Sequence, residues 1–251
     1  MRRILFLLAL LLPGMLWSDQ PSVRLLFVGD SITDGGWGRS GGSMQPAEER
    51  NLKDQNHLYG HSYMFLCAAR LESQSPERGY HCQNRGISGY TLEDLHARWE
   101  QDVATFRPHL LSILIGTNDV AKHYDRSQEP FDVAAWEQRY RAYIERTQSA
   151  LPQAKLILGT PFVAAVGRLG AKADFQQRAA AIDACAKVVR RLAAEYKAVL
   201  VDYHRCFARL AEQHPTTEAS YWIWDGIHPT PAGHARMADC WLEAVGPIRT
   251  N

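Results

Sequence analysis

The sequence has almost no net charge, no internal repeats and no low-complexity tract. Its 28 lysine and arginine residues against 27 acidic residues give a formal net charge of +1. Bulk electrostatics therefore favour neither nucleic acid nor an anionic membrane as a partner. With 251 residues, 46% of them hydrophobic, the chain is long enough for one domain with a sizeable core.

Cysteine pairs at metal-binding or redox spacing are also missing. No Cys-x-x-Cys occurs, which argues against a zinc ribbon and a thioredoxin-like site. An odd number of cysteines leaves at least one unpaired, and the sequence does not show which of the others pair. His57 and His61 lie outside a His-Glu-x-x-His frame, so we predict no metal site. The five cysteines are Cys67, Cys82, Cys185, Cys206 and Cys240, and we expect small buried hydrophobes rather than reactive thiols.

Only the amino terminus carries a marked apolar run. Arg2 and Arg3 precede residues 4–12, which are all apolar, and a polar exit follows at Ser18. This order is typical of a secretory signal, and the run is shorter than the roughly 20 residues that span a membrane. We therefore predict a signal peptide at 1–18 and a single domain at 19–251. The protein would be periplasmic or extracellular, without a membrane anchor after cleavage. The alternative is a buried first helix.

Short apolar strands alternate with segments of helical periodicity along the rest of the chain. This alternation predicts a three-layer α/β/α sandwich with a central, mostly parallel five-stranded sheet. The expected strands are Val23–Val28, Tyr80–Arg85, Leu110–Ile115, Leu156–Leu158 and Val199–Val201. The expected helices are Leu58–Leu71, Thr91–Val103, Val133–Leu151, Phe175–Tyr196, Cys206–Gln213 and Pro231–Val245.

Three residues follow the carboxyl ends of predicted strands and should meet at one edge of the sheet. They are Ser31, Gly86 and Asn118, and this edge is where ligands bind in open α/β sheets. A serine in such a turn usually caps the next helix. Ser31 becomes a candidate nucleophile only if a base, an orienting acid and oxyanion donors are present as well.

A base and an acid lie together near the carboxyl terminus. Asp225 and His228 are three residues apart in the loop Asp-Gly-Ile-His-Pro, immediately before the last predicted helix. A carboxylate on one ring nitrogen fixes the tautomer and stabilises the imidazolium that forms when serine loses its proton. The alternative is a surface turn whose aspartate caps the following helix.

Four short blocks, in this order, resemble the SGNH (GDSL-type) hydrolase family. They are Gly-Asp-Ser-Ile-Thr at 29–33, the glycine turn at Gly86, Gly-Thr-Asn-Asp at 116–119 and Asp-Gly-Ile-His-Pro at 225–229. The resemblance implies a flavodoxin-like fold and a serine esterase that needs no metal and no organic cofactor. It assigns the nucleophile to Ser31, the base to His228 and the orienting acid to Asp225.

The same resemblance implies an oxyanion hole. Its donors would be the backbone N–H groups of Ser31 and Gly86 and the side-chain amide of Asn118. Loss of one such donor typically costs about 2.7–4 kcal/mol in the transition state. Glycine at 86 would let the substrate approach the backbone, and an amide at 118 does not repel an oxyanion as a carboxylate would. The alternatives are a plain turn at Gly86 and a helix cap at Asn118.

Residues around these blocks provide candidates for substrate contact. The glycine-rich stretch Asp34–Asn56 shows no regular period and leaves the sheet beside the candidate nucleophile, so we expect a wall of the cleft. Trp37 and Trp224 lie in or next to the predicted cleft loops, and exposed rings there would stack on sugars; the alternative is the core. Asp30 and Asp119 are expected to brace loops, and His234 to lie on a helix surface.

These features predict a secreted serine esterase that forms and hydrolyses an acyl-enzyme. The expected substrate is a small-molecule or polysaccharide ester, with short-chain O-acetyl groups on carbohydrate as the first choice. Lysophospholipase or thioesterase activity on longer acyl chains is the alternative enzyme. A carbohydrate-binding protein that retains the fold without turnover is the alternative outside enzymes. No nucleic-acid partner is expected, and the sequence predicts no oligomeric state.

Overall fold

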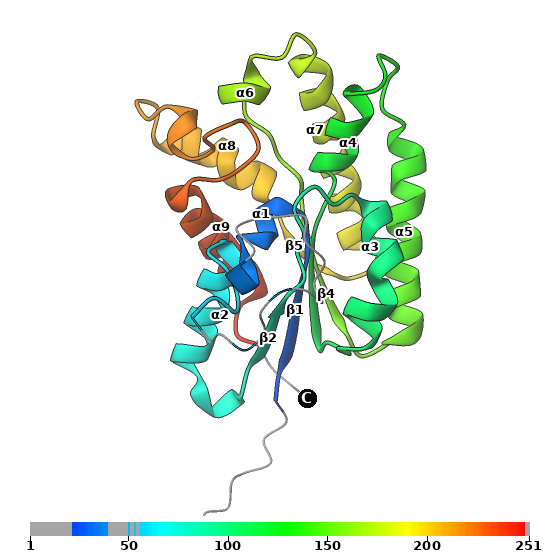
Figure 1. The fold of residues 1–251 in the computed structure, drawn as a ribbon, viewed down its shortest axis with the longest axis vertical. Coiled ribbons are helices and arrows are strands. Elements are labelled where there is room, and N and C mark those ends of the chain that lie inside the picture. Colours follow the sequence, from blue (N-terminus) through cyan, green and yellow to red (C-terminus); the bar gives the residue numbers. More distant parts are fainter. Residues whose placement is uncertain (1–21, 40–49, 51–52, 54–55, 249–251) are drawn as a thin grey trace, which may run out of the picture.

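A computed structural model describes residues 22–39, 50, 53 and 56–248 (Figure 1). Within these residues, five parallel strands form one sheet of order β2-β1-β3-β4-β5. The strands are β1 (Arg24–Gly29), β2 (His81–Asn84), β3 (Leu110–Leu114), β4 (Lys155–Gly159) and β5 (Val199–Val201). The strand order reverses beside β1, which makes the carboxyl end of β1 a topological switch point. The predicted fold class is confirmed, whereas the predicted signal peptide lies outside the described residues.

Helices cover both faces of the sheet (Figure 1). One face carries α3 (Leu92–Trp99), α4 (Thr117–Tyr124), α5 (Val133–Ala150) and α7 (Phe175–Glu195). The other carries α2 (Tyr63–Gln74), α8 (Tyr203–Gln213) and α9 (Pro231–Val245). Shorter segments are α1 (Ser31–Asp34), η1 (Trp37–Arg39), η3 (Pro76–Arg78), η4 (Glu100–Ala104), α6 (Gly167–Gly170) and η5 (Ala219–Tyr221). The sheet is therefore buried on both sides.

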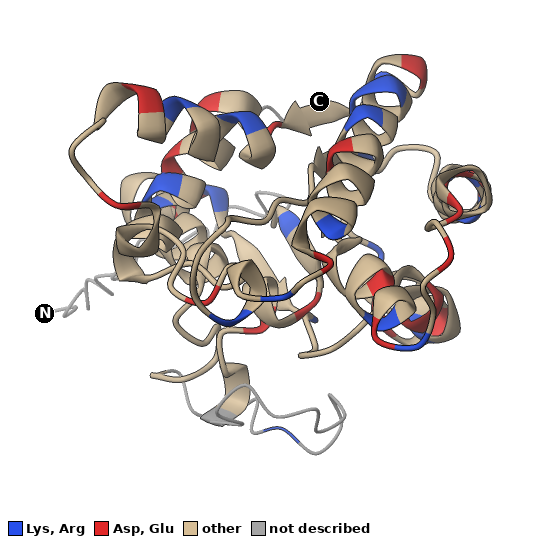
Figure 2. Ribbon diagram, turned by 90° about the horizontal axis from the view of Figure 1, so that it is seen from above, with Lys and Arg blue, Asp and Glu red and all other residues tan. Residues whose placement is uncertain are grey.

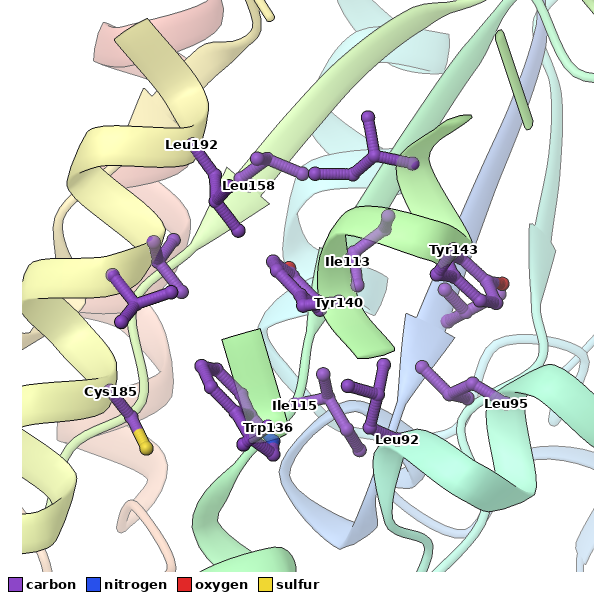
Figure 3. Close-up of a cluster of buried hydrophobic side chains, with 14 of the residues drawn as sticks. Leu92, Leu95, Ile113, Ile115, Trp136, Tyr140, Tyr143, Leu158, Cys185 and Leu192 are labelled. Carbon is purple, nitrogen blue, oxygen red and sulfur yellow. The ribbon is translucent and has the colours of Figure 1, made fainter. Parts of the chain in front are cut away.

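Alternate residues of β1 face opposite halves of the core. Leu26 and Val28 join the cluster under α3, α5 and α7, whereas Leu25 and Phe27 join the cluster under α2, α8 and α9. Figure 3 shows the first cluster, in which aromatic side chains of α5 lie between residues of β3, α3 and α7. Close packing on both faces fixes the strands, and with them the loops at their carboxyl ends.

The predicted helix at Leu58–Leu71 begins later than expected. Helix α2 starts at Tyr63 because Ser62 caps it and accepts a hydrogen bond from the Met64 N–H at 3.3 Å. Helix α4 was not predicted. It begins within Gly-Thr-Asn-Asp without a side-chain cap, so the sequence carries no helix-start signal there. The bounds predicted for β5 and α9 are confirmed.

Cys206 of α8 and Cys240 of α9 form a disulfide, whereas Cys67, Cys82 and Cys185 are free and buried. The expectation of small buried hydrophobes thus holds for the three free cysteines only. Charged residues of both signs are interspersed on the outer helices (Figure 2). In the part of the chain that the structure describes, none of the helices has the length and apolar character needed to cross a membrane.

Candidate active site

The turn after β1 fixes Ser31 at the carboxyl edge of the sheet. A Cβ atom on Gly29 would lie 2.4 Å from the Leu114 carbonyl oxygen and 2.6 Å from Thr33 Oγ1, so only glycine fits. Asp30 caps α1, and its Oδ1 accepts a hydrogen bond from the Ile32 N–H at 3.0 Å. Ser31 is therefore the first residue of a tightly anchored helical turn and remains half-buried.

The loop that carries Asp225 and His228 is held by the segment that follows β4. The N–H of Ala164 donates to the Gly226 carbonyl at 2.9 Å, and the N–H of Leu169 donates to the Asp225 carbonyl at 3.0 Å. Gly226 has a φ of 94°, a conformation that favours glycine. These contacts set the direction in which the two functional side chains leave the loop.

Ser31, His228 and Asp225 form a continuous chain of hydrogen bonds. Ser31 Oγ lies 2.7 Å from His228 Nε2, and His228 Nδ1 lies 2.9 Å from Asp225 Oδ2. Because Nδ1 donates to the carboxylate, Nε2 is left to accept the Ser31 hydroxyl proton. The sequence placed these three residues in one site, and the structure brings all three together.

The environment of the Asp225 carboxylate favours its charged form, although the side chain is only 4% exposed. Burial alone would raise its pKa, but hydrogen bonds outweigh burial and hold the pKa below its ordinary value. Oδ1 accepts from the backbone N–H groups of Ile227 at 3.0 Å and His228 at 2.8 Å. A charged Asp225 can stabilise an imidazolium on His228.

The structure does not offer the N–H of Gly86 to a substrate, which corrects the predicted donor. This N–H donates to Asn84 Oδ1 at 2.9 Å, and the residue is buried. A Cβ atom at position 86 would lie 2.6 Å from the backbone nitrogen of Asp34. Gly86 is a glycine because it packs beneath α1, and not because a substrate approaches it.

Gly89, a second glycine in the same turn, is better placed to donate its backbone N–H to a substrate. Gly89 has a φ of 82° and sits in a turn closed by a 3.1 Å hydrogen bond from the Tyr90 N–H to the Ile87 carbonyl. Its own N–H makes no hydrogen bond to any described residue. The preceding Ser88 lines the pocket described below. The positive φ is the signal that distinguishes Gly89 from Gly86, and it is invisible in the sequence.

Asp34, which sequence reasoning did not single out, ties this turn to α1. Its carboxylate accepts hydrogen bonds from the backbone N–H and the hydroxyl of Ser88, at 2.9 and 2.8 Å. It also forms a buried ion pair with Arg50 at 2.6 Å. Asp34 therefore links the turn that carries Ser31 to the turn that carries Gly89.

Asn118 lies in the first turn of α4, beside the Gly89 turn. One hydrogen of its side-chain amide is donated to the Tyr90 carbonyl at 3.1 Å. An amide nitrogen carries two hydrogens, so the second is available to a ligand. The contact orients the amide next to Gly89, at the edge of the sheet where Ser31 lies.

A pocket of about 910 Å³ opens at Ser31 and His228. Its other lining residues are Gly35, Gly36, His61, Phe65, Leu66, Ser88, Trp224, Pro229, Thr230, Pro231 and His234. Gly35 and Gly36 belong to the stretch that was predicted to wall the cleft, most of which lies outside the described residues. His234 is half-buried in the pocket wall, so the expectation of a helix-surface position is wrong.

The two candidate tryptophans differ sharply in exposure. Trp224 is 61% exposed in the pocket rim, and its ring centroid lies 6.4 Å from that of His228. Trp37 is fully buried, and its indole N–H donates to the Gly86 carbonyl at 2.8 Å. The structure thus places Trp37 in the core below the site, which corrects the expectation of a sugar-stacking ring there.

Two carboxyl groups brace the site, as expected. Burial raises the pKa of Asp30 to about 7 and that of Asp119 to about 6. Both oxygens of Asp119 accept the Leu92 N–H, at 3.1 and 3.2 Å. These contacts hold the ends of α1 and α3 rather than reaching into the pocket.

Fold and site together define an ester hydrolase. The chain belongs to the GDSL-like lipase/acylhydrolase family, whose sequence pattern matches residues 27–236. It is therefore a carboxylic ester hydrolase.

Individual proteins that resemble this chain include acetylxylan esterases. The chain is 33% identical over 226 residues to an acetylxylan esterase of Geobacillus stearothermophilus, covering 89% of this chain and 94% of the relative. A crystal structure of a catalytic mutant of an acetylxylan esterase from that organism superimposes with a TM-score of 0.73 and 29% identity. The match covers 92% of this chain and 100% of the other. A crystal structure of a GDSL-like lipase from Parabacteroides merdae superimposes with a TM-score of 0.74 and 31% sequence identity. This match covers 89% of this chain and 95% of the other.

Proposed function

We propose that this protein is an exported serine esterase that removes acetyl groups from carbohydrate through an acyl-enzyme on Ser31. The hydrogen-bonded chain from Ser31 through His228 to the charged Asp225, opening onto a pocket, is the observation that carries the proposal. The similarity to an acetylxylan esterase over 89% of the chain supports the choice of substrate.

The hydrogen-bond geometry supports the following role for each residue in the proposed reaction. His228 Nε2 takes the Ser31 hydroxyl proton while Oγ attacks the ester carbonyl, and the tetrahedral intermediate forms. His228 then gives this proton to the departing alcohol, which leaves an acetyl group on Ser31. Water then attacks that ester while His228 takes one of its protons, and His228 gives this proton to Ser31 Oγ as the acyl bond breaks and acetate is released. Asp225 stabilises the imidazolium in both halves of the reaction.

Three donors are available for the oxyanion. They are the backbone N–H of Ser31, the backbone N–H of Gly89 in place of Gly86, and the free amide hydrogen of Asn118. The Ser31 N–H, like that of Gly89, makes no hydrogen bond to a described residue. Because the surrounding turns are anchored, these donors need no reorganisation as charge develops, and each is worth about 2.7–4 kcal/mol in the transition state.

Trp224 supplies the surface for a sugar. Its ring is exposed at the rim of the pocket and roughly parallel to the His228 ring, with an interplanar angle of 28°. A flat aromatic face that is open to solvent suits the apolar face of a pyranose. A sugar stacked there would lie beside the Ser31 hydroxyl.

Export rests on two observations. The amino terminus has the basic, apolar and polar order of a secretory signal, and the Cys206–Cys240 disulfide suits an oxidising compartment. Sequencing the amino terminus of the mature protein tests this part. We expect a start near residue 19, and a mature chain that begins at Met1 would contradict export.

The substrate is tested by acetate release from acetylated xylan, compared with hydrolysis of aryl esters of increasing acyl length. We expect acetate from the polysaccharide, a steep loss of activity beyond short acyl chains, and a fall in kcat of about 10⁴-fold or more on both substrates in Ser31→Ala. Preference for long acyl chains would move the substrate to lipids or thioesters. Turnover that is unaffected by Ser31→Ala would overturn the mechanism.

A further inference from the structure

His234 lies in the wall of the active-site pocket but takes no part in the hydrogen-bonded chain of Ser31, His228 and Asp225. It belongs to the first turns of α9, which begins at Pro231 after the Thr230 cap. Its ring is half-buried and lines the same pocket as Ser31 and His228. The mechanism leaves this histidine without a role.

The tautomer of His234 is fixed by a backbone contact. Its Nδ1 lies 3.1 Å from the backbone nitrogen of Tyr63, at the start of α2, and accepts that N–H. A nitrogen that accepts a hydrogen bond carries no proton, so the neutral ring must carry its proton on Nε2. Nε2 makes no hydrogen bond to any described residue, although the ring is half-buried beside the catalytic histidine.

The ring also stays neutral where an esterase works. Burial, together with the neighbouring His61 and His228, lowers the pKa of His234 to about 4. A neutral His234 does not repel the imidazolium that forms on His228 during the reaction. At neutral pH it therefore presents a fixed N–H donor rather than a second cation.

The surroundings of His234 make this donor selective. The pocket that His234 lines has apolar residues from α2, from the loop before α9 and from the start of α9, together with the polar residues His61 and Thr230. The apolar residues are Phe65, Leu66, Pro229 and Pro231. A fixed donor in a largely apolar wall helps to orient a ligand, because a ligand that lacks a matching acceptor leaves the donor unpaired.

We propose that His234 Nε2–H donates a hydrogen bond to a hydroxyl or ring oxygen of the sugar that carries the acetyl group. His234 is then a specificity-determining residue for the alcohol part of the ester. This inference rests on the proposed carbohydrate esterase function. It assigns recognition of the alcohol to a polar contact from α9, in addition to the stacking surface of Trp224.

Two substitutions test the roles of the two ring nitrogens separately. In His234→Asn, the side-chain oxygen takes the place of Nδ1 and still accepts the Tyr63 N–H, but the donor to the pocket is lost. In His234→Gln, the amide nitrogen reaches the place of Nε2, but the acceptor for Tyr63 is lost. His96→Asn is the matched control, because His96 lies on α3 at the opposite face of the sheet.

The measurement is the ratio of kcat/KM for an acetylated xylooligosaccharide to kcat/KM for 4-nitrophenyl acetate, which has no sugar oxygen. We expect this ratio to fall about tenfold in His234→Asn, to stay within about threefold of wild type in His234→Gln, and to be unchanged in His96→Asn. Tm should fall more in His234→Gln than in His234→Asn. An unchanged ratio in His234→Asn, or equal losses on both substrates, would overturn the inference.

The unsubstituted protein provides two further checks. If it releases no acetate from the xylooligosaccharide, the proposed function fails and this inference fails with it; if it does, the variant ratios test His234 alone. Nitrogen NMR of the folded protein at neutral pH should show the Nε2–H tautomer for His234. A ring protonated on Nδ1, or on both nitrogens, would contradict the proposal without any substitution.

Discussion

The proposed active site contains two regions with opposite physical character. The proposed catalytic chain, Ser31, His228 and Asp225, is closed by short hydrogen bonds, and its acid is almost completely buried. The proposed recognition wall, Phe65, Trp224 and His234, contains an indole ring that is 61% exposed and a histidine nitrogen that no described residue pairs. Catalysis requires atoms that are held in reacting geometry before the substrate arrives. Recognition requires exposed or unpaired groups whose contacts are made only when the substrate binds.

The residues of the two regions also come from different numbers of chain segments. The base and the acid of the catalytic chain come from one five-residue loop, and the nucleophile from one tight turn. The recognition wall combines α2, the loop before Asp225 and the start of α9. The regions should therefore respond differently to substitution, which gives three tests.

The largest effect should follow from disturbing the catalytic chain. In Asp225→Asn, the amide oxygen can still accept the backbone N–H groups of Ile227 and His228, but its NH₂ would face His228 Nδ1. This favours the tautomer with the proton on Nε2, which cannot accept the Ser31 proton. We expect kcat for 4-nitrophenyl acetate to fall about 10⁴-fold with little change in Tm. A loss of less than tenfold would show that Asp225 does not orient the base.

A second test concerns the buried carboxyl next to the nucleophile. The pKa of Asp30 is raised from 3.8 to about 7 in the folded state. Between these pH values the unfolded chain releases this proton and the folded protein keeps it, so this group makes the free energy of unfolding fall as pH rises. Asp30→Asn removes the titration and keeps an oxygen for the Ile32 N–H.

We therefore expect the stability of Asp30→Asn relative to wild type to increase from pH 4 to pH 7, by at most about 4 kcal/mol. Urea unfolding at a series of pH values measures this difference. A difference that is constant across that range would show that Asp30 titrates normally and that its burial carries no electrostatic cost.

The smallest effect should come from the recognition wall. Trp224→Ala removes the exposed ring but leaves the Ser31–His228 contact in place. We expect KM for acetylated xylan to rise about tenfold, or about 1.4 kcal/mol, while kcat on the polysaccharide stays within about threefold of wild type. Tyr221→Ala is the control, because Tyr221 is also exposed but does not line the pocket. Equal losses in both variants would indicate a general surface effect.

The meeting of Ser31, His228 and Asp225 could be predicted from the sequence because short local motifs mark all three residues. Asp225 and His228 are neighbours on one loop, and Ser31 follows a recognisable strand. Asn118 likewise follows β3. The bounds of β5 and α9 were equally clear, since an apolar run and a proline at the first turn mark them.

The rest depends on contacts between distant segments. Gly86 and Gly89 look alike in sequence, and only the 2.9 Å contact to Asn84 and the positive φ of Gly89 separate them. Trp37 lies in the stretch that was predicted to wall the cleft, which suggested an exposed ring, yet its indole N–H donates to the buried Gly86 carbonyl. The role of His234 follows from a hydrogen bond to a residue 171 positions away, which no local pattern indicates.

Labelling with a fluorophosphonate probe, followed by peptide mapping, tests the central claim most directly. The probe needs the activated nucleophile and carries no sugar, so it reads the catalytic chain separately from the recognition wall. The account predicts one label per chain, on Ser31, with labelling slowed by orders of magnitude in Asp225→Asn and changed by less than about threefold in Trp224→Ala. No label, or a label on another residue, would contradict the account.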